Sequence, residues 1–475
     1  MKGLFNAKKE ITMKKICILV MLVLAGVMAE AQTSVWTGSR RMWNRGSGTE
    51  DDPFLIESAE HLAYLSFIVG KGIETRGKYF KLTTDIDLNG RDDFQWFPIG
   101  VLNDAFYEDG CERGVPINYQ VSGSSFGGHF DGGDHRISNL YVDNGKTCAG
   151  LFGIVEGTEE FPAVVEHVFV TNGYVKGSFS GGVVGGYSSG KSFVVSHCWN
   201  GADIEGADAG GIVGGCADRV YNCYNLGNVT STGNGGGIVG RSANEISECY
   251  NEGNVSTVTF AGGILGGYNT NIDVVVSNCY NTGSISSAGQ VYPSIPGSFV
   301  GGIVGFIMKG VPEILNCYNV GTVSSAFLPP CGVAGFIKDG YVDNCYYLNT
   351  CGGSGEGYPM AAETMRDPSF VDMLNYETNV WCADTLNHND GYPILGNNNL
   401  AVDEYDTGMF ALYPNPSRGK ITVEGTGTMR VFNVLGQAIL TSEIKEQAVF
   451  ELPQGLYFIR LETGDKVGTR RVVVE

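Results

Sequence analysis

Two short phrases alternate through the middle of the chain, and they limit its fold more than any other feature. One phrase is glycine-rich, reads GGVVG, GGIVG, GGILG or CGVAG, and begins at Gly181, Gly210, Gly236, Gly262, Gly301 and Cys331. The other reads CWN, CYN or CYY and begins at Cys198, Cys223, Cys249, Cys279, Cys317 and Cys345. Successive cysteines of this set are 25, 26, 30, 38 and 28 residues apart. A period of this length, with glycine pairs and β-branched residues, is typical of stacked repeats.

Apolar residues occupy two further fixed positions around these cysteines. A Val or Ile lies three residues before each one, at Val195, Val220, Ile246, Val276, Ile314 and Val342. Most copies have another six residues after it, at Ile204, Val229, Val255, Ile285 and Val323. Glycine pairs disfavour a helix by about 1 kcal/mol per residue. Each unit is therefore predicted to be one coil of short strands, and the stack to hold about eight or nine coils spaced by about 4.8 Å.

The repeat region from Cys148 to Leu348 resembles the GLUG motif, named for its Gly-Leu-hydrophobic-Gly core. This motif recurs in bacterial adhesin-like surface proteins and in the non-catalytic part of some immunoglobulin A peptidases. The resemblance implies an extended, extracellular β-helical module. Together with the repeat, it predicts an all-β fold with a right-handed parallel β-helix over residues 148–348.

Both ends of this solenoid have sequence features of caps, and we assign residues 32–147 to the N-terminal cap with the first coils. Ser58 is a suitable N-cap for a helix that begins at the next residue, and residues 79–88 alternate as a strand does. The segment from Phe126 resembles a first full coil. Residues 349–396 are predicted to be the C-terminal cap, with a short helix near Met365.

The first 31 residues have the pattern of a secretory signal peptide. A basic Met13-Lys14-Lys15 precedes the apolar run Ile16–Met28, and Ala29-Glu30-Ala31 provides small residues for cleavage. We expect Met13 to be the true start and Gln32 the first mature residue. No other stretch is long and apolar enough for a transmembrane helix, so we expect no transmembrane segment.

The charge of the mature chain excludes one class of partner. Removing residues 1–31 leaves 26 Lys and Arg side chains against 49 Asp and Glu, a net charge near −23. Such a surface repels phosphate backbones. We therefore expect no nucleic-acid partner.

The composition changes after a polar linker at residues 397–408. Glycine pairs stop, and the landmarks are Tyr413-Pro414-Asn415-Pro416, MRVFNVLGQAIL, LPQGLYFIRLETG and a terminal RRVVVE. They resemble the C-terminal sorting domain of the type IX secretion system, an immunoglobulin-like β-sandwich. For residues 409–475 this implies interaction with the type IX secretion machinery, and export to the surface of a Gram-negative bacterium or release from it. The residues that carry the sorting signal by this resemblance are Tyr413, Pro414, Asn415, Pro416, Gly436, Gly455 and Tyr457. A plain β-sandwich binding module is the alternative.

Twelve of the 13 cysteines remain after cleavage, in an oxidising exterior that permits disulfides. Six of them hold the equivalent repeat positions, and we interpret these as a column of mostly free, buried thiols; bridges between them are the alternative. The better disulfide candidates lie off the column: Cys111, Cys216, Cys351 and Cys382.

An aromatic residue follows each cysteine of the repeat, at Trp199, Tyr224, Tyr250, Tyr280, Tyr318 and Tyr346. Neighbouring residues of a strand face opposite sides, so either the cysteines or the rings point inward. Outward rings would form a strip suited to binding sugars or proteins. Inward rings would fill the coil.

Signals for catalysis or metal binding are weak. The sequence DIDLNG at Asp85 begins like a calcium loop, but Trp96 stands where the loop needs Glu. Asp131 and Asp134 are candidates for the paired catalytic carboxylates of a glycosidase. However, Asp and Gly are also the residues expected in a DGGD turn. We expect no metal or other cofactor.

These observations predict a secreted or surface-attached solenoid that binds a host protein or glycan, adhesin-like, without catalysis. A β-helical polysaccharide lyase or glycoside hydrolase is the first alternative, because this fold also hosts such enzymes. A structural surface component is the second.

Overall fold

The computed structural model describes most of the chain, namely residues 33–100, 125–143, 148–186, 192–268, 273–289, 298–376, 378–385, 387–396, 411–413, 419–433, 438–453, 455–463 and 466–474. The predicted signal peptide, the predicted linker, Cys111, Gly436 and the Pro414–Pro416 landmark lie outside these residues. The chain forms two compact units, residues 1–393 and 394–475, and each is described by itself. None of the helices in the described ranges has both the length and the apolar character that crossing a bilayer requires.

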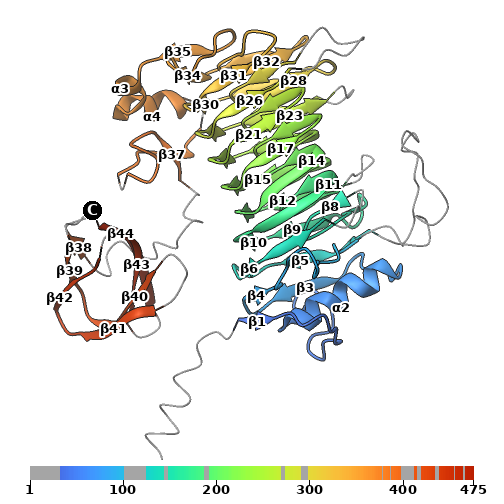
Figure 1. The fold of residues 1–475 in the computed structure, drawn as a ribbon, viewed down its shortest axis with the longest axis vertical. Helices are drawn as coiled ribbons and strands as arrows, with labels where there is room; N and C mark the ends of the chain where they lie inside the picture. The colour runs from blue at the N-terminus through green and yellow to red at the C-terminus, as the bar shows by residue number, and fades with distance from the viewer. Residues whose placement is uncertain are drawn as a thin grey trace, which may run out of the picture. The chain divides into compact units, whose positions relative to one another are not determined.

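The larger unit is a parallel β-helix whose chain winds repeatedly through the same three sheets (Figure 1). Sheet 1 has ten parallel strands: β2 (Phe54–Ile56), β3 (Tyr79–Leu82), β5 (His129–Asp131), β9 (Ala163–Glu166), β12 (Phe193–Ser196), β15 (Cys216–Tyr221), β19 (Ser242–Ser247), β24 (Val275–Ser277), β29 (Glu313–Leu315) and β33 (Tyr341–Asp343). Because β2 and β3 extend it at the N-terminal end, the stack is longer than the eight or nine coils expected. The predicted all-β solenoid is confirmed.

Sheet 2 contains the strands that begin after each repeat cysteine. Its eleven strands are β1 (Ser34–Val35), β4 (Ile86–Asp87), β6 (Arg136–Ser138), β10 (Phe169–Val170), β13 (Trp199–Asn200), β16 (Tyr224–Asn225), β20 (Tyr250–Asn251), β25 (Tyr280–Asn281), β30 (Tyr318–Asn319), β34 (Tyr346–Leu348) and β35 (Tyr358–Met360). Equivalent repeat residues pair in register; for example, Tyr250 pairs with both Tyr224 and Tyr280. The repeats therefore lie directly on top of one another.

Sheet 3 contains the strands that lead into the glycine phrases. Its eleven strands are β7 (Leu140–Val142), β8 (Cys148–Ala149), β11 (Gly173–Gly181), β14 (Asp203–Gly210), β17 (Val229–Ser231), β18 (Asn234–Gly236), β21 (Val255–Thr257), β22 (Phe260–Gly262), β26 (Ile285–Ser287), β27 (Val300–Gly301) and β31 (Val323–Ser325). Beyond the glycine phrases, β23 (Leu265–Tyr268), β28 (Val304–Ile307) and β32 (Ala334–Ile337) form a short fourth sheet.

A left-handed residue forms the corner between sheets 1 and 2. The residue before each repeat cysteine has a φ between 48° and 52°, at His197, Asn222, Glu248, Asn278, Asn316 and Asn344. This conformation is uncommon outside glycine and is best tolerated by Asn. The corner breaks the alternation of the strand. As a result, the Val or Ile three residues before the cysteine and the cysteine itself both face inward.

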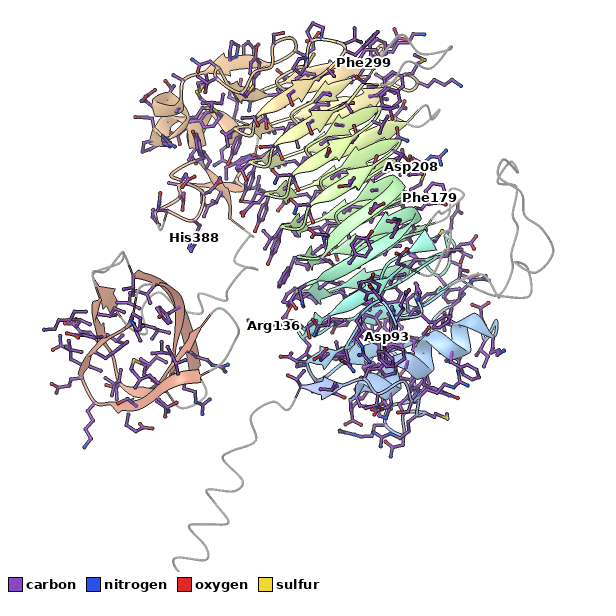
Figure 2. The ribbon with its side chains drawn as sticks, viewed as in Figure 1. Asp93, Arg136, Phe179, Asp208, Phe299 and His388 are labelled. Carbon is purple, nitrogen blue, oxygen red and sulfur yellow. The ribbon has the colours of Figure 1, made fainter. Side chains whose placement is uncertain are left out.

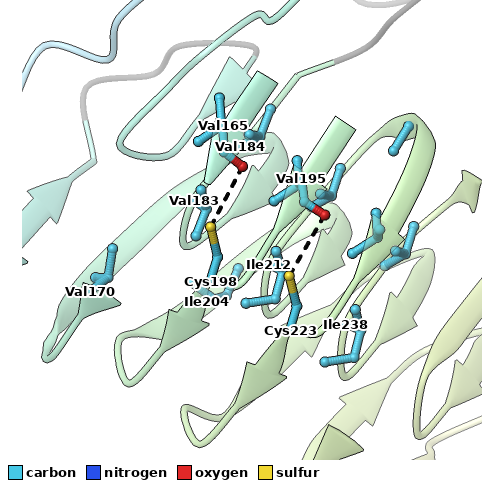
Figure 3. Close-up of a cluster of buried hydrophobic side chains, with 14 of the residues drawn as sticks. Val165, Val170, Val183, Val184, Val195, Cys198, Ile204, Ile212, Cys223 and Ile238 are labelled. Carbon is cyan, nitrogen blue, oxygen red and sulfur yellow. Dashed lines mark hydrogen bonds between the residues drawn. The ribbon is translucent and has the colours of Figure 1, made fainter. Parts of the chain in front are cut away.

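The interior of the coils is a continuous apolar core (Figure 3). Val195, Cys198 and Ile212 are fully buried, and Ile204 closes the same layer from sheet 3. The equivalent residues of the next coil, such as Cys223 and Ile238, stack directly against this layer. Burial of this repeated apolar set, which no single coil achieves alone, stabilises the stack.

The glycine phrases allow adjacent coils to approach closely. A Cβ atom at Gly237 would overlap the Gly263 carbonyl oxygen and the Asn251 side chain, whereas one at Gly70 would meet no atom within 4 Å. We expect Gly237→Ala to destabilise the protein by about 1–3 kcal/mol through overpacking. The same change at Gly70, the last residue of a helix, should be neutral or slightly stabilising. Thermal melting of both variants checks this, and equal melting temperatures would contradict the close approach.

Caps cover both ends of the solenoid. Helix α2 (Ala59–Gly70) begins as predicted, because the Ser58 hydroxyl accepts a hydrogen bond from the His61 amide at 3.3 Å. After the last coil come α3 (Ala362–Met365), α4 (Pro368–Leu374), β36 (Trp381–Cys382) and β37 (Ile394–Leu395). The predicted helix near Met365 thus consists of two short helices.

The smaller unit has two antiparallel sheets around one core. One sheet contains β38 (Ala411–Tyr413), β39 (Lys420–Glu424) and β42 (Gln447–Glu451), and the other contains β40 (Gly427–Asn433), β41 (Ala438–Ile444), β43 (Gly455–Thr463) and β44 (Lys466–Val474). Ile421 from the first sheet and Val431 and Ile459 from the second are fully buried in this core. The arrangement is consistent with the immunoglobulin-like domain predicted here.

Candidate functional site

The predicted aromatic residues form a column of stacked rings. The Tyr224 and Tyr250 rings, like those of Tyr250 and Tyr280, have centroids 4.8 Å apart and interplanar angles of 4° and 0°. Tyr280 and Tyr318 continue the column at 5.2 Å, and Trp199 stacks on Tyr224 at 5.7 Å. The strand register places Tyr346 next, opposite Tyr318.

The rings lie on the outside of the coil, because the residues on either side of each ring face inward. Before each ring is a buried cysteine, and after most of them is a buried asparagine. These asparagines form an internal hydrogen-bonded chain: the Asn225 amide nitrogen donates to the Asn251 side-chain oxygen at 2.8 Å, and Asn251 donates to Asn281 at the same distance. Each amide also donates to a backbone carbonyl two residues on, as Asn225 does to Gly227 at 2.7 Å.

Although they lie outside the coil, the tyrosine rings are not open to solvent. From Tyr224 to Tyr346 every ring residue is at most 6% exposed, whereas Trp199 is half-buried. The C-terminal cap packs against the column: the Trp381 ring lies 5.4 Å from that of Tyr318, and the Asn389 amide donates to the Tyr318 hydroxyl at 2.7 Å.

The structure therefore matches neither arrangement considered for these rings, an open strip or a filling of the coil. Burial raises the pKa of the Tyr250, Tyr280 and Tyr318 hydroxyls, which stay protonated. A ligand-binding role of the column remains a prediction, and Trp199 is its most accessible member.

The repeat cysteines form the predicted column of free, buried thiols. Each Sγ donates to the carbonyl oxygen two residues earlier, for example from Cys198 to Ser196 at 3.1 Å and from Cys223 to Tyr221 at 3.2 Å. All eleven cysteines in the described ranges are free. Three of the predicted disulfide candidates, Cys216, Cys351 and Cys382, are among them. Burial raises the pKa of the Cys198 thiol, so it is held protonated and unreactive.

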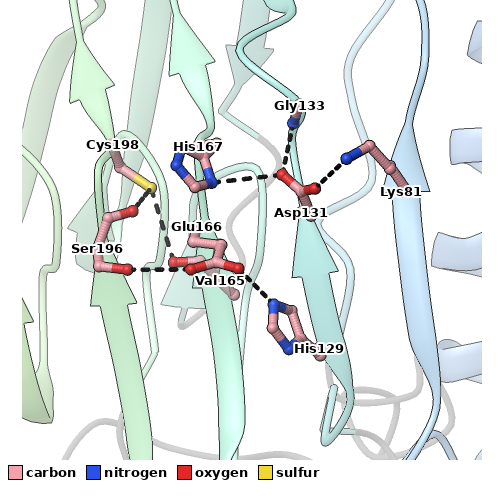
Figure 4. A network of polar contacts seen from close by, with 9 residues as sticks. All are labelled: Lys81, His129, Asp131, Gly133, Val165, Glu166, His167, Ser196 and Cys198. Atoms are coloured by element: carbon pink, nitrogen blue, oxygen red, sulfur yellow. Dashed lines mark hydrogen bonds and ion pairs between the residues drawn. The ribbon is translucent and has the colours of Figure 1, made fainter. Parts of the chain in front are cut away.

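A polar cluster on the outer face of sheet 1 was not recognised from the sequence. We call it the histidine–carboxylate cluster, and it consists of Lys81, His129, Asp131, Glu166, His167 and Ser196 (Figure 4). Its members come from β3, β5, β9 and β12 and from the corner after β9. Because Lys81, Asp131, Glu166 and Ser196 are register partners on successive strands, their side chains line up across four coils.

Each carboxylate of this cluster contacts a basic side chain. Asp131 contacts the Lys81 ammonium group at 2.7 Å and His167 Nδ1 at 3.4 Å. Glu166 contacts His129 Nε2 at 2.6 Å through one oxygen and accepts from the Ser196 hydroxyl at 3.5 Å through the other. The pairs link neighbouring coils on the outside of the sheet.

These contacts keep Asp131, Glu166 and Lys81 ionised near neutral pH. Burial opposes ionisation of Asp131, but hydrogen bonds from His167 and Lys81 outweigh it and lower the pKa of its carboxyl. The hydrogen bond from His129 lowers the pKa of Glu166. Asp131 in turn raises the pKa values of His167 and Lys81. A general acid needs a raised carboxyl pKa, and a lysine base needs a lowered one, so Asp131, Glu166 and Lys81 are not poised for proton transfer.

The other candidate residues from the sequence have structural contacts. Asp134 is exposed in the DGGD turn with a φ of 59°. Asp85 accepts from the Arg136 amide at 3.0 Å, and Asp87 accepts from the Asn89 amide at 2.7 Å. Trp96 is buried, and its indole donates to a backbone carbonyl. Within the described ranges, no three His, Cys, Asp or Glu side chains are grouped as metal ligands.

The sequence also contains a G-x-S-x-G pattern at residues 123–127, which was missed among the candidate catalytic motifs. Its serine is Ser125, whose hydroxyl donates to the Glu156 carboxylate at 3.3 Å. A nucleophile elbow places its serine between a strand and a helix. Ser125 instead precedes strand β5 of the solenoid, so it is not in the position of such a nucleophile.

A mostly buried ion pair links two coils beside the glycine phrases. Phe179, Asp208 and Phe299 mark this part of the solenoid (Figure 2). The Asp208 carboxylate lies 3.4 Å from an Arg241 guanidinium nitrogen and accepts from the Asn234 amide at 2.6 Å. The guanidinium lies 5.5 Å from the centre of the Phe179 ring. Burial raises the pKa of the Asp208 carboxyl, and the pair serves to join adjacent turns of the chain.

Comparison with known proteins identifies the end of the chain. Residues 411–475 match the family described as "Secretion system C-terminal sorting domain". The chain ends in a sorting domain of type IX secretion. It is therefore exported to the cell surface or the extracellular space and interacts with the secretion machinery. Of the predicted sorting residues, Gly455 begins β43 and Tyr457 is buried in the core of the domain.

Part of the chain is similar to parts of two much longer proteins. Halomucin of Haloquadratum walsbyi is 30% identical over 161 residues, which is 34% of this chain and 2% of halomucin. A protein of Evansella cellulosilytica assigned as a Gly-rich membrane protein is 28% identical over 142 residues, which is 30% of this chain and 13% of that protein. This chain thus spans a small part of either relative. The resemblance to the GLUG motif stays a prediction.

One solved structure was also matched. It is a crystal structure from Bacteroides ovatus that was assigned as an immunoglobulin A1 protease, and it matches with a TM-score of 0.47 at 22% identity. The match covers 75% of this chain and 95% of the other.

Proposed function

We propose that the exported protein is a binding protein whose solenoid holds a glycan or a host protein and carries out no reaction of its own. The observation that supports this most is the pairing within the histidine–carboxylate cluster. Asp131 and Glu166 both have lowered pKa values and contact basic side chains, Lys81 and His129 respectively. Acid–base cleavage of a polysaccharide needs one group held ready to give or take a proton.

One observation favours the second candidate, a polysaccharide-cleaving enzyme. The cluster brings titratable side chains from successive coils onto one face of the solenoid. An elongated polymer lying across the coils would contact several of them at once. For this candidate, ligand binding would have to break the contact between His129 and Glu166 and raise the pKa of Glu166 toward neutrality.

Incubating the mature protein with neutral and acidic polysaccharides and with extracellular-matrix proteins separates these candidates. We expect retention of at least one ligand, with no new reducing ends and no unsaturated sugar products. Product formation that disappears in Glu166→Gln would establish the enzyme instead. Absence of both retention and products would favour the structural surface component. A variant with an exposed change on sheet 3, Thr230→Ala, serves as the control for handling and folding.

A further inference from the structure

Two tyrosines lie side by side on the outer face of sheet 3. Tyr141 on β7 and Tyr174 on β11 are register partners. Their strand neighbours Leu140, Val142 and Val175 are fully buried inside the coil. Because side chains alternate along a strand, the tyrosines must point outward, and both are half-buried. They belong to neither the buried aromatic column nor the apolar core.

Hydrogen bonds hold both rings in fixed orientations. The ring centroids are 5.6 Å apart, and the planes are inclined by 42°. The Tyr141 hydroxyl donates to the Asp92 carboxylate, and the Tyr174 hydroxyl donates to the Glu205 carboxylate at 2.6 Å. Lys176 Nζ contacts the other Glu205 oxygen at 2.8 Å. A ring that is already oriented loses little conformational freedom when a ligand binds.

The phenols remain hydrogen-bond donors over the whole physiological range. The hydrogen bond to Asp92 raises the pKa of Tyr141 to about 12. Burial, together with the hydrogen bond to Glu205, raises the pKa of Tyr174 to about 12. Tyr141 and Tyr174 therefore keep the same protonation state and the same hydrogen-bond donors at every physiological pH.

A row of polar side chains continues from the tyrosines along the sheet. The register places Asp203 next to Tyr174. Beyond it, the Asn228 amide donates to the Asp203 carboxylate at 3.0 Å, and the Asn254 amide donates to the Asn228 oxygen at 3.1 Å. These residues are exposed and are one strand apart, at about 4.8 Å, which is comparable to the length of one pyranose unit.

We propose that Tyr141 and Tyr174 are the anchor of a binding site for a neutral glycan chain; this rests on the proposed function and names its ligand class. Pyranose rings present apolar C–H faces that pack on aromatic rings, and their hydroxyls bond to carboxylates and amides. The tyrosines supply the first kind of contact. Asp92, Glu205 and the Asn228 row supply the second.

The charges around the site decide between neutral and acidic sugars. Asp92, Glu205 and Asp203 surround the pair, and Asp143 acts on both tyrosines electrostatically. Lys176 is engaged by Glu205. The site is therefore anionic, and uronic acids, sialic acids and sulfated sugars are repelled by like charge.

Binding of oligosaccharides to the full mature protein and its variants tests the site. The probes are hexamers of glucose, mannose and galactose, with polygalacturonate and hyaluronan as acidic comparisons and the matrix proteins used above. We expect at least one neutral hexamer to bind. Tyr141→Ala and Tyr174→Ala should each weaken the affinity for this hexamer at least tenfold. Tyr174→Phe should weaken the affinity less, because the ring remains. Tyr221→Ala, a half-buried outward tyrosine on sheet 1, is the matched control and should bind as the wild type does.

The possible outcomes distinguish failure of the glycan site from failure of the proposed function. Binding is compared only among variants whose melting temperature equals that of the wild type. If an alanine variant unfolds, Tyr174→Phe tests the site in its place. Undiminished glycan binding by folded tyrosine variants, or preference for acidic glycans, would overturn the site while leaving the proposed function intact. Loss of protein binding, with glycan binding unchanged, would assign the tyrosines to a protein partner and overturn the glycan site. A wild-type protein that binds neither glycan nor protein would overturn both.

Discussion

Replacing Ile238 with aspartate will destabilise the solenoid by about 3–5 kcal/mol, the range seen when a buried charge has no partner. Ile238 is fully buried, and its backbone is hydrogen-bonded to Ile212 on one side and Ile264 on the other, both also fully buried. The new carboxylate would meet only apolar side chains in this column, and desolvating an unpaired charge is costly. Thermal and urea unfolding, followed by circular dichroism in the far ultraviolet, measures the effect.

Two control variants separate charge burial from other effects of the change. Ile238→Val removes one methyl group at the same place and should cost about 0.5–1.5 kcal/mol. Ser256→Asp introduces the same charge at an exposed position of sheet 3, between the uncharged Thr230 and Ser286, and should change stability by less than about 0.5 kcal/mol. If Ile238→Asp melts with the wild type, the side chain does not face the interior.

The register of the solenoid was predictable because the recurring residues are the ones that stack. Val220, Ile246 and Val276 recur three residues before a cysteine, and in the structure they pair directly with one another. Which side faced inward was not predictable from alternation, because the left-handed corner interrupts it. The signal was present in the sequence, since Asn, the residue best suited to that conformation, precedes the cysteine at Asn222, Asn278, Asn316 and Asn344.

The burial of the aromatic column could not be derived from the repeat. Trp381 and Asn389, which contact Tyr318, lie more than sixty residues further along the chain and outside the repeat. Only tertiary packing brings the C-terminal cap onto the rings, and no local pattern predicts it. By contrast, the third letter of the CYN phrase did carry information, because its asparagines form the hydrogen-bonded chain inside the coil.

Both polar sites on the outer faces were missed because they lie in the first coils, where the repeat is poorly preserved. At the repeat position shared by Lys81, Asp131, Glu166 and Ser196, the residue type changes from coil to coil, so no recurring letter marks the histidine–carboxylate cluster. The tyrosine pair left a weak signal: Tyr-Val occurs at Tyr141 and again at Tyr174, in the strand that leads to the glycine phrase. Two copies are too few to stand out as a period.

Deleting residues 411–475 will abolish surface display and leave the solenoid folded. The matched sorting domain is confined to these residues, so its removal takes away the part that the secretion machinery recognises. The solenoid core and the domain core share no residue within the described ranges. Truncation should therefore retain the protein in the periplasm with an unchanged melting transition. Cell fractionation and protease treatment of intact cells measure where it accumulates.

A transfer experiment distinguishes a sorting signal from a general need for the complete protein. We expect residues 411–475 to bring a passenger to the surface or the medium when they are fused to a fluorescent protein that carries its own signal peptide. The reason is that the domain has its own hydrophobic core, which includes Ile421, Val431 and Ile459, and should therefore fold independently of the solenoid. As a matched variant, Ile459→Asp should unfold the domain and abolish transfer, since an unpaired charge would enter that core. Surface delivery of the truncated solenoid, or equal delivery by the Ile459→Asp fusion, would contradict a role of the folded domain in export.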